Sequence, residues 1–287
     1  MSVPEHISRC PNCGHEPFDS DFCPDCGQKK LTEKDLRVTS IAGDFISGFL
    51  SLENTFFTTF KAFITRPSRY VQEYNSGARK KYIAPVKWFL LANAFYFLFP
   101  AINTFTTSLN IQLNYLYYSD LTYGLIQSVI KHSGWTFEAF EEEYDALTFT
   151  LSKALLFILP LLFGIGSKLT SIRQSNPLVF HINYGFVIHA FIVLFTTSLV
   201  PGAYIIMAKL LQSEGMLKLI TETNLTLVSL ILINTYGYFL YRKFFESPWW
   251  ANILRWLSLN LIFIVLLYFY RFFLLIATLA WMWLFRI

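Results

Sequence analysis

Four cysteines near the amino terminus are the residues whose type and spacing point most directly to chemistry. They form two copies of one short pattern, Cys10-Pro11-Asn12-Cys13-Gly14 and Cys23-Pro24-Asp25-Cys26-Gly27. A C-x-x-C turn places two thiolates on one tight loop, and two such loops supply the four sulfur ligands of a tetrahedral zinc site. The glycine after each pair permits the backbone conformation that the turn requires. The pattern therefore predicts a zinc ribbon that holds one structural Zn²⁺ through Cys10, Cys13, Cys23 and Cys26.

A site made of four cysteines leaves no coordination position for water, so we expect the metal to be structural and not catalytic. A head this small cannot bury a sufficient core, and metal binding would fold it. Two disulfides are the alternative, but they need an oxidising compartment, and the polar start Met1–His6 lacks the pattern of a cleaved signal peptide. His15 could compete as a ligand, although four cysteines suffice. The acidic interval Asp19–Asp21 disfavours nucleic acid as a partner.

A second set of polar residues lies inside the apolar segments of the chain. Ionisable side chains at membrane depth cost several kcal/mol unless they have partners, which makes them candidates for function. His181 and His189 are about 12 Å apart along a straight helix, too far for one metal ion to bind both. We interpret the set as hydrogen bonding between helices, with a proton or substrate path as the alternative. The set comprises Asn93, His181, His189, Asn234 and Arg271.

The composition indicates the kind of scaffold that must position these residues. The chain has 287 residues, of which 54% are hydrophobic and 15% are charged, whereas a soluble domain is about 25% charged. The apolar residues occur in long blocks, which excludes a disordered chain and disfavours a soluble enzyme. The net charge of +4 is too small to indicate nucleic-acid binding. We therefore expect an all-α polytopic membrane protein with a small zinc ribbon and interfacial amphipathic helices.

The chain divides into three predicted parts: the zinc ribbon at 1–30, amphipathic juxtamembrane helices at 31–82 and a transmembrane bundle at 83–287. In the second part, apolar residues recur at steps of three and four from Thr39 to Ile64, which indicates one face of a helix. These residues are Phe45, Phe49, Leu52, Phe56, Phe60 and Phe63. Three charged residues interrupt the segment, so we expect it to lie in the interface and not to span the bilayer. Core helices of a soluble subdomain are the alternative.

A further short helix is predicted from Pro67 to Tyr74, because proline suits a first helical turn and Gly77 suits a stop. Basic and aromatic residues follow, just before the first apolar span, which is typical of a cytoplasmic flank. Such a cluster attracts anionic lipid, at about 1 kcal/mol per basic residue, although it could also be a topology signal alone. The residues predicted to contact lipid are Arg66, Arg69, Arg79, Lys80, Lys81, Lys87 and Trp88.

About five spans are predicted, at residues 85–105, 148–167, 178–207, 224–241 and 253–285. Pro160 is expected to kink the second span and Pro201-Gly202 to break the third. The interval 106–147 holds six acids and one base, Lys131, which places it outside the cytoplasm. The amino terminus would then be cytoplasmic and the carboxyl terminus periplasmic. The last segment is expected to be one long tilted helix, with a re-entrant end at 272–287 as the alternative.

A longer run of residues carries a resemblance to a known family. The ribbon is followed by Arg37-Val38-Thr39, then Glu53, Thr58-Thr59 and Pro67, and then the segment from Glu73-Tyr74 to Pro85. Over residues 10 to about 100 the chain resembles a bacterial family of zinc-ribbon membrane proteins that is catalogued only as a domain of unknown function. The helix from His181 to His189 is similar to a histidine-containing helix of that family. The resemblance implies a topology and no reaction.

No arrangement of residues typical of a catalytic site is found in the sequence, so we do not expect an enzyme. The first functional hypothesis is an adaptor or assembly factor of the bacterial inner membrane, which docks partners through a cytoplasmic zinc ribbon. Its expected partners are the bilayer with its anionic lipid and a membrane protein or a second copy of the chain. The alternative is a small transporter, channel or lipid-handling protein with a polar path around His189.

Overall fold

The computed structural model describes residues 9–16, 20–30, 55–99, 101, 105–171, 176–212, 215, 221–242 and 248–285. Within these residues the regular elements are helices, and Phe22 and Lys29 form an isolated antiparallel bridge in the head. The elements are α2 (Thr55–Thr65), α3 (Pro67–Asn75), α4 (Pro85–Leu98), α5 (Leu109–Asn114), α6 (Ser119–Ser133), α7 (Phe137–Leu155), α8 (Ile158–Leu169), α9 (Leu178–Phe191), the π-helix η2 (Ile192–Leu199), α10 (Val200–Leu210), α12 (Glu222–Tyr241) and α13 (Trp249–Phe285).

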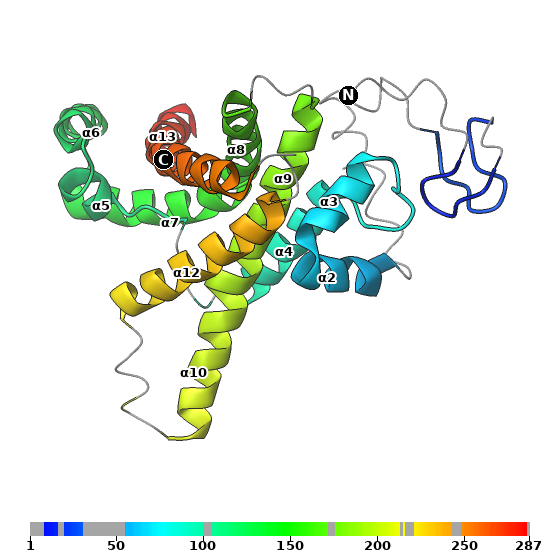
Figure 1. Ribbon diagram of the computed structural model, residues 1–287. Coiled ribbons are helices and arrows are strands. Elements are labelled where there is room, and N and C mark those ends of the chain that lie inside the picture. The colour runs from blue at the N-terminus through cyan, green and yellow to red at the C-terminus, as the bar shows by residue number, and fades with distance from the viewer. Residues whose placement is uncertain are drawn as a thin grey trace. The chain divides into compact units, whose positions relative to one another are not determined.

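The chain forms two compact units, of which the first comprises Met1–Ile102 and Pro160–Phe263. Helix α9 is the centre of this unit, because nearly all of its side chains are buried. Helices α3, α4 and α12 pack against it, and Figure 1 shows α2 and α3 beside the long rod that α9 begins. Asn183 of α9 donates a hydrogen bond to Asn75 Oδ1 of α3 at 2.7 Å. The central helix is thus enclosed by protein along its first half.

The third predicted span continues past the proline that was expected to break it. Leu178–Leu210 is one apolar helix of 33 residues, made of α9, η2 and α10. Pro201 lies in the first turn of α10, directly after the π-helical turns of η2. Wider π-helical turns leave room for a proline that lacks an N–H group and would clash in an α-helix. The expected break at Pro201-Gly202 is therefore wrong, and the helix changes its hydrogen-bonding register instead.

Three helices of the described residues are long and apolar enough to cross a membrane, and a bent pair could supply a fourth. The three are Leu178–Leu210, Thr223–Tyr241 and Trp249–Leu284. The first predicted span corresponds to α4, which has 14 residues and measures about 21 Å, against a hydrocarbon core of about 30 Å. The structure therefore supports a membrane protein, while the count of five spans stays a prediction.

The second predicted span corresponds to the bent pair Phe137–Leu155 and Ile158–Leu169. The break falls just before Pro160, whose ring would clash with the carbonyl of Leu156 in a continuous helix. Gly164 of α8 lies against α9, and a Cβ built on it would be 2.6 Å from Ile182 Cα. Glycine is therefore what allows these two helices to approach closely.

The last helix, α13, runs without a break from Trp249 to Phe285. Its 37 residues measure about 55 Å, longer than the hydrocarbon core, which agrees with one long helix at this end of the chain. The helix continues past Arg271, and residues 272–285 contain no turn. The structure therefore gives no support to a re-entrant end in the described part of this segment.

The second unit comprises Asn103–Leu159 and Ile264–Ile287. Its core joins α5, α6 and α7 to the end of α13 through Leu109, Ile126, Phe140, Tyr144, Leu275, Leu279 and Met282. Thr148 and Thr278 hydroxyls are hydrogen-bonded at 2.9 Å, and Tyr270 donates to the Ser152 carbonyl at 3.0 Å. Helix α6 ends at Gly134, whose left-handed conformation is the usual one for a glycine after a helix. The predicted outer loop is thus largely helical.

Helix α2 packs its aromatic face on the rest of the first unit. Phe63 is fully buried, and its ring contacts the rings of Trp88 and Tyr236 at centroid distances of 5.4 and 5.6 Å. Phe56 and Phe60 also lie against Trp88. The aromatic face of α2 is therefore covered by other parts of the protein. The remaining members of the predicted face, Phe45, Phe49 and Leu52, lie outside the described residues.

Candidate functional site

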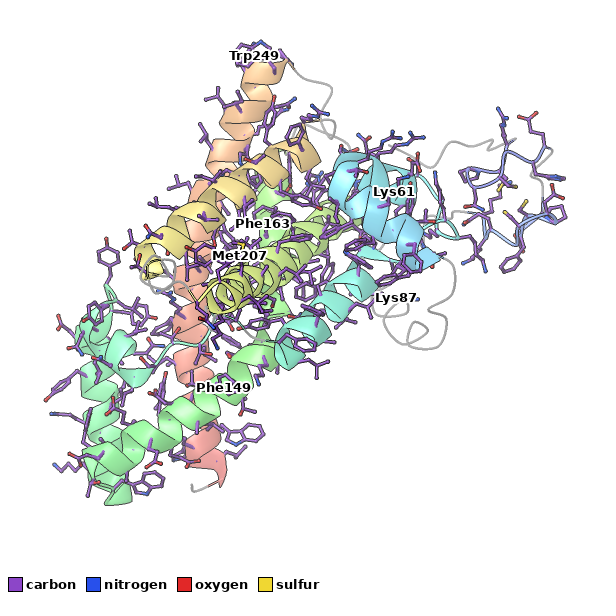
Figure 2. The ribbon with its side chains drawn as sticks, turned by 90° about the horizontal axis from the view of Figure 1, so that it is seen from below. Lys61, Lys87, Phe149, Phe163, Met207 and Trp249 are labelled. Carbon is purple, nitrogen blue, oxygen red and sulfur yellow. The ribbon has the colours of Figure 1, made fainter. Side chains whose placement is uncertain are left out.

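The four cysteines of the head meet at one point. Their sulfur atoms all lie within 4.8 Å of one another, with Cys10 Sγ 3.7 Å from Cys26 Sγ and Cys13 Sγ 3.6 Å from Cys23 Sγ. A disulfide would bring two sulfur atoms to about 2.05 Å, so the thiols are free. In Figure 2 the sulfur atoms, drawn in yellow, gather between the two loops of the head. This arrangement could hold a metal ion between four thiolates.

The two cysteine loops repeat the same backbone hydrogen bonds. Gly14 N donates to Cys10 O, and Gly27 N donates to Cys23 O, both at 2.8 Å. Both glycines have positive φ, at 85° and 67°, which a residue with a Cβ adopts only at a cost. The first cysteine of each loop in turn donates its N–H to the carbonyl five residues on. Local sequence alone therefore shapes each half of the site.

His15 contacts an acid of the other loop and lies outside the sulfur cluster. Its Nδ1 is 2.7 Å from Asp25 Oδ2, and the group of ligand atoms that could share one metal contains only the four cysteine sulfurs. His15 and Asp25 thus join the two loops side by side. This agrees with the expectation that four cysteines suffice.

Gln28 links the head to the segment between α3 and α4. Its side chain is 2% exposed, and its Oε1 accepts a hydrogen bond from Lys80 N at 2.9 Å. Its own backbone O accepts from Cys23 N at 2.8 Å, so the same residue closes the second cysteine loop. One residue thus links the second cysteine loop to the basic segment around Lys80.

Glu73 is the centre of a polar cluster on α3. Its carboxylate accepts hydrogen bonds from Arg69 Nε at 2.5 Å, Lys81 Nζ at 2.7 Å and Tyr82 OH at 2.7 Å. Partial burial by itself would raise the pKa of Glu73, but the hydrogen bonds from Lys81, Arg69 and Tyr82 outweigh it and lower the pKa to about 2. The carboxylate is thus ionised at neutral pH and orients two basic side chains.

The segment between α3 and α4 folds back on both preceding helices. Tyr70 OH donates to Ile83 O at 2.6 Å, and Ile83 N donates to Thr59 Oγ1 at 2.9 Å. Gly77 has a φ of 107°, in agreement with the stop predicted there. The residues that carried the family resemblance between Thr58 and Pro85 are thus held together by their own hydrogen bonds.

The residues predicted to contact lipid have different surroundings. Arg66 and Arg69 are exposed, and Lys80 is exposed as well, whereas Lys87 is half-buried. Lys81 is bound to Glu73, and the Arg79 guanidinium lies 5.6 Å from the centre of the Tyr74 ring. Trp88 is only 3% exposed, because its ring packs against the aromatic face of α2. The indole therefore contributes to the core of the first unit, and lipid contact by the basic residues stays a prediction.

His181 connects three helices. Its Nδ1 is hydrogen-bonded to Ser167 Oγ of α8 at 2.8 Å, and the same Oγ contacts Tyr241 OH of α12. His181 is fully buried on α9. Hydrogen bonds of this kind join helices within a bilayer, which agrees with the interpretation of these residues as contacts between helices.

His189 is enclosed by aromatic rings. Its Nδ1 is 2.7 Å from Gly185 O of the same helix, and its ring meets those of Phe163 and Phe263 at centroid distances of 5.5 and 5.6 Å. Its Nε2 is buried and has no hydrogen-bond partner in the described part of the chain. Asn93 of α4 is also buried, and its Oδ1 likewise lacks a partner there.

Asn234 and Arg271 have neighbours of their own. Asn234 Oδ1 accepts hydrogen bonds from Trp256 Nε1 and Asn260 Nδ2, each at 3.0 Å, which joins α12 to α13. Arg271 belongs to the second unit, where its backbone O accepts from Gln112 Nε2 at 3.2 Å. The predicted polar residues thus do not form one cluster: His181 and Asn234 make hydrogen bonds between helices, whereas His189 is bonded within its own helix.

Comparison with known proteins identifies a similarity without an activity. A family described as "Protein of unknown function (DUF3667)" matches residues 53–97, which include α2, α3 and nearly all of α4. No curated protein and no solved structure matches the chain. The match thus lies within the segment that carried the resemblance and supports a likeness to an uncharacterised family. The Glu73 cluster lies in the matched segment.

Sequence reasoning missed two features of this region. Glu73 was recognised only as part of a motif, although its spacing of four residues from Arg69 is typical of an ion pair on a helix. Arg242 directly follows the fourth predicted span, and no sequence pattern indicates that it lies beside Arg66 and Arg69. The Glu73–Arg69 pair thus had a local signal in the sequence, whereas the position of Arg242 depends on the packing of α12.

Proposed function

We propose that this protein is a non-enzymatic adaptor or assembly factor of the bacterial inner membrane, which docks a partner protein through a cytoplasmic zinc ribbon. The observation that carries the proposal is the closed set of four cysteine sulfurs. A tetrahedral metal bound there has four protein ligands and no position for water or substrate, which is the arrangement of a structural site.

The sulfur distances support zinc as the metal. Four sulfur atoms at about 2.3 Å from a tetrahedral zinc ion are about 3.8 Å apart, and the two measured pairs are 3.6 and 3.7 Å apart. A zinc ion would therefore fit with little movement of the loops. Binding would convert a short segment without a core into a rigid surface.

Phe22 is the side chain of the ribbon best suited to contact a partner. It is 59% exposed although it directly precedes the buried ligand Cys23. Its backbone is fixed by the bridge to Lys29. Aromatic residues held on a rigid backbone are frequent anchors of protein interfaces. Gln28 would then connect this surface to the basic segment next to the membrane helices.

The alternative function, a transporter or channel, requires a polar path around His189. The ring of His189 is flanked by Phe163 and Phe263. The side-chain oxygen of Asn234 already accepts hydrogen bonds from Trp256 and Asn260. These surroundings favour packing between helices over a hydrated path. The adaptor therefore has the better support.

A crosslinking experiment tests the adaptor. A photo-reactive amino acid in place of the exposed Asp21 should form an adduct of one defined mass with a membrane protein in cells of the native host. The variant Phe22→Ser should reduce that adduct at least about tenfold, as expected for the loss of an interface anchor, whereas Phe57→Ser, at an exposed phenylalanine of α2, should leave it unchanged.

Metal analysis of the same preparations completes the test. The purified chain should contain one zinc per molecule, and replacement of all four cysteines by serine should remove both the zinc and the adduct. His15→Ala should retain the zinc. Zinc that persists without the cysteines would contradict the metal assignment. An adduct that is insensitive to Phe22→Ser and to metal loss would contradict docking through the ribbon.

A further inference from the structure

A pocket of about 360 Å³ lies between the start of α3 and the end of α12. This volume is within the range of about 300–1,000 Å³ that is typical of small-molecule sites. The pocket belongs to the first unit and uses none of the residues of the metal site. Its lining residues are Thr65, Arg66, Pro67, Ser68, Arg69, Phe239 and Arg242.

Three of the seven lining residues are arginines, and none of the seven is acidic. Arg242 lies with its guanidinium 4.7 Å from the centre of the Phe239 ring, and the carboxylate of Glu73 holds Arg69 in position. Glu73 shares its charge with two further donors, Lys81 and Tyr82. The pocket therefore keeps an excess of positive charge, which an anionic group would neutralise.

The first turn of α3 adds polar groups to the same pocket. Helix α3 begins at Pro67, has no side-chain cap and has no acidic residue in its first turn. The N–H groups of Ser68 and Arg69 precede the first helical hydrogen bond, from Tyr70 N to Arg66 O at 3.1 Å. The Ser68 hydroxyl is a lining group, and the residue is only 4% exposed. By geometry its Oγ makes no hydrogen bond within the described ranges, and the buried Tyr184 hydroxyl of α9 is its polar neighbour.

The pocket also lies at the end of a candidate membrane span. Arg242 directly follows Tyr241, the last residue of the apolar helix Thr223–Tyr241, in which only 17% of the most apolar 18-residue stretch is buried inside the protein. Phe239 of the pocket is 44% exposed. A lipid molecule next to this helix would have its acyl chains along the exposed apolar face and its headgroup at the level of the arginines.

We propose that this pocket binds the phosphate group of an anionic lipid headgroup. The guanidinium groups of Arg66, Arg69 and Arg242 would provide charged, paired hydrogen bonds to the phosphate oxygens. The free N–H groups of α3 and the Ser68 hydroxyl would complete the contacts, as at other helix N-termini that bind phosphate. A phosphate monoester is favoured over a zwitterionic headgroup, because the latter carries an ammonium group into a site with three positive charges.

Lipid titration of the full-length protein tests this assignment. The purified chain in detergent is titrated with dioleoyl phosphatidic acid, dioleoyl phosphatidylcholine or inorganic phosphate, and bound lipid is counted by native mass spectrometry. We expect one phosphatidic acid to bind at least about tenfold more tightly than phosphatidylcholine, as a charge-assisted contact requires. Inorganic phosphate should compete with the lipid only at much higher concentration.

Three variants locate the bound lipid. Arg66→Gln and Arg242→Gln should each weaken the binding of phosphatidic acid about tenfold or more. Ser68→Ala should weaken it several-fold without any change in charge. Lys61→Gln is the matched control, because Lys61 is an exposed base of the neighbouring helix α2, labelled in Figure 2, and does not line the pocket.

Two results would overturn the proposal. If Arg66→Gln and Arg242→Gln bind phosphatidic acid as Lys61→Gln does, attraction by the overall charge explains the binding and the pocket does not. If inorganic phosphate binds as tightly as phosphatidic acid, the ligand is a soluble phosphate and not a lipid headgroup. Neither result depends on the zinc content. The lipid proposal can therefore fail while the adaptor proposal stands, and the adaptor proposal can fail while the lipid proposal stands.

Discussion

At the scale of single residues, Glu73 shows how one carboxylate organises a basic surface. It accepts hydrogen bonds from Arg69, Lys81 and Tyr82, which come from α3 and from the segment that follows it. Two of the bases predicted to contact lipid are therefore ordered by the protein itself. Arg69, one of these two, lines the arginine pocket, so Glu73 contributes to that pocket by positioning it.

The titration of Glu73 predicts a dependence of stability on pH. The folded pKa of about 2 is lower than the value of about 4.3 in an unfolded chain. The contribution of Glu73 is therefore fully present above about pH 4.3 and is lost as the pH falls toward 2. The difference in melting temperature between the wild type and Glu73→Gln, measured in detergent, should be constant from pH 7 to 5 and should shrink at lower pH. A difference that grows on acidification would contradict the assigned hydrogen bonds.

At the scale of elements, proline and glycine determine how the helices of the first unit run and pack. Pro67 begins α3, and Pro160 lies just after the break between α7 and α8. Pro201 follows a π-helical segment and leaves the long helix continuous. The sequence predicts that a proline disturbs a helix, but it does not predict which response the neighbouring helices allow.

Gly164 gives a prediction about the contact between α8 and α9. A side chain at this position would meet Ile182 Cα at 2.6 Å, and backbone atoms can make room only if the helices move apart. Gly164→Ala should therefore destabilise the protein by about 1–3 kcal/mol, as overpacking does. The melting temperature of the purified protein measures the effect.

A matched substitution separates packing from helix propensity. Gly124 lies in α6, and a Cβ added there would meet no atom of another element within 4 Å. Gly124→Ala should be neutral or should stabilise by about 0.5–1 kcal/mol, because alanine favours a helix. If both alanine variants had the same effect, the close approach of α8 and α9 would not be the reason for glycine at position 164.

At the scale of the whole molecule, the chain divides into two compact units, and the residues that the structure describes contain three or four candidate spans. The long helix Leu178–Leu210 is mostly buried inside the protein, whereas Thr223–Tyr241 is mostly exposed. Of these two helices, Thr223–Tyr241 therefore leaves more of its apolar surface uncovered by the rest of the protein. The orientation of these helices across the membrane follows from charge alone and stays a prediction.

Labelling of an engineered cysteine tests the orientation. Glu143 lies on α7 in the acidic interval 106–147, which the distribution of charge places outside the cytoplasm. In intact cells, Glu143→Cys should react with a thiol reagent that cannot cross the membrane. A cysteine at Asp21 in the ribbon should react only after the cells are opened. The reverse pattern would invert the topology.

The sequence by itself determined the features that depend on neighbouring residues. The spacing of the four cysteines predicted that they would cluster, Pro67 and Gly77 predicted the short helix between them, and the apolar blocks predicted helices long enough to cross a membrane. These features follow from local backbone geometry and from the length that a span requires, so a short stretch of sequence contains the necessary information.

Only the tertiary structure decided which distant residues meet. It enclosed Trp88 among phenylalanines, gave Asn234 its partners on α13, and brought Arg242 next to Arg66 and Arg69. An arginine after a span has the same local pattern whether it faces lipid, water or another arginine. Its neighbours depend on how α12 packs against α3 and α9, and that packing results from many weak contacts distributed over the whole unit.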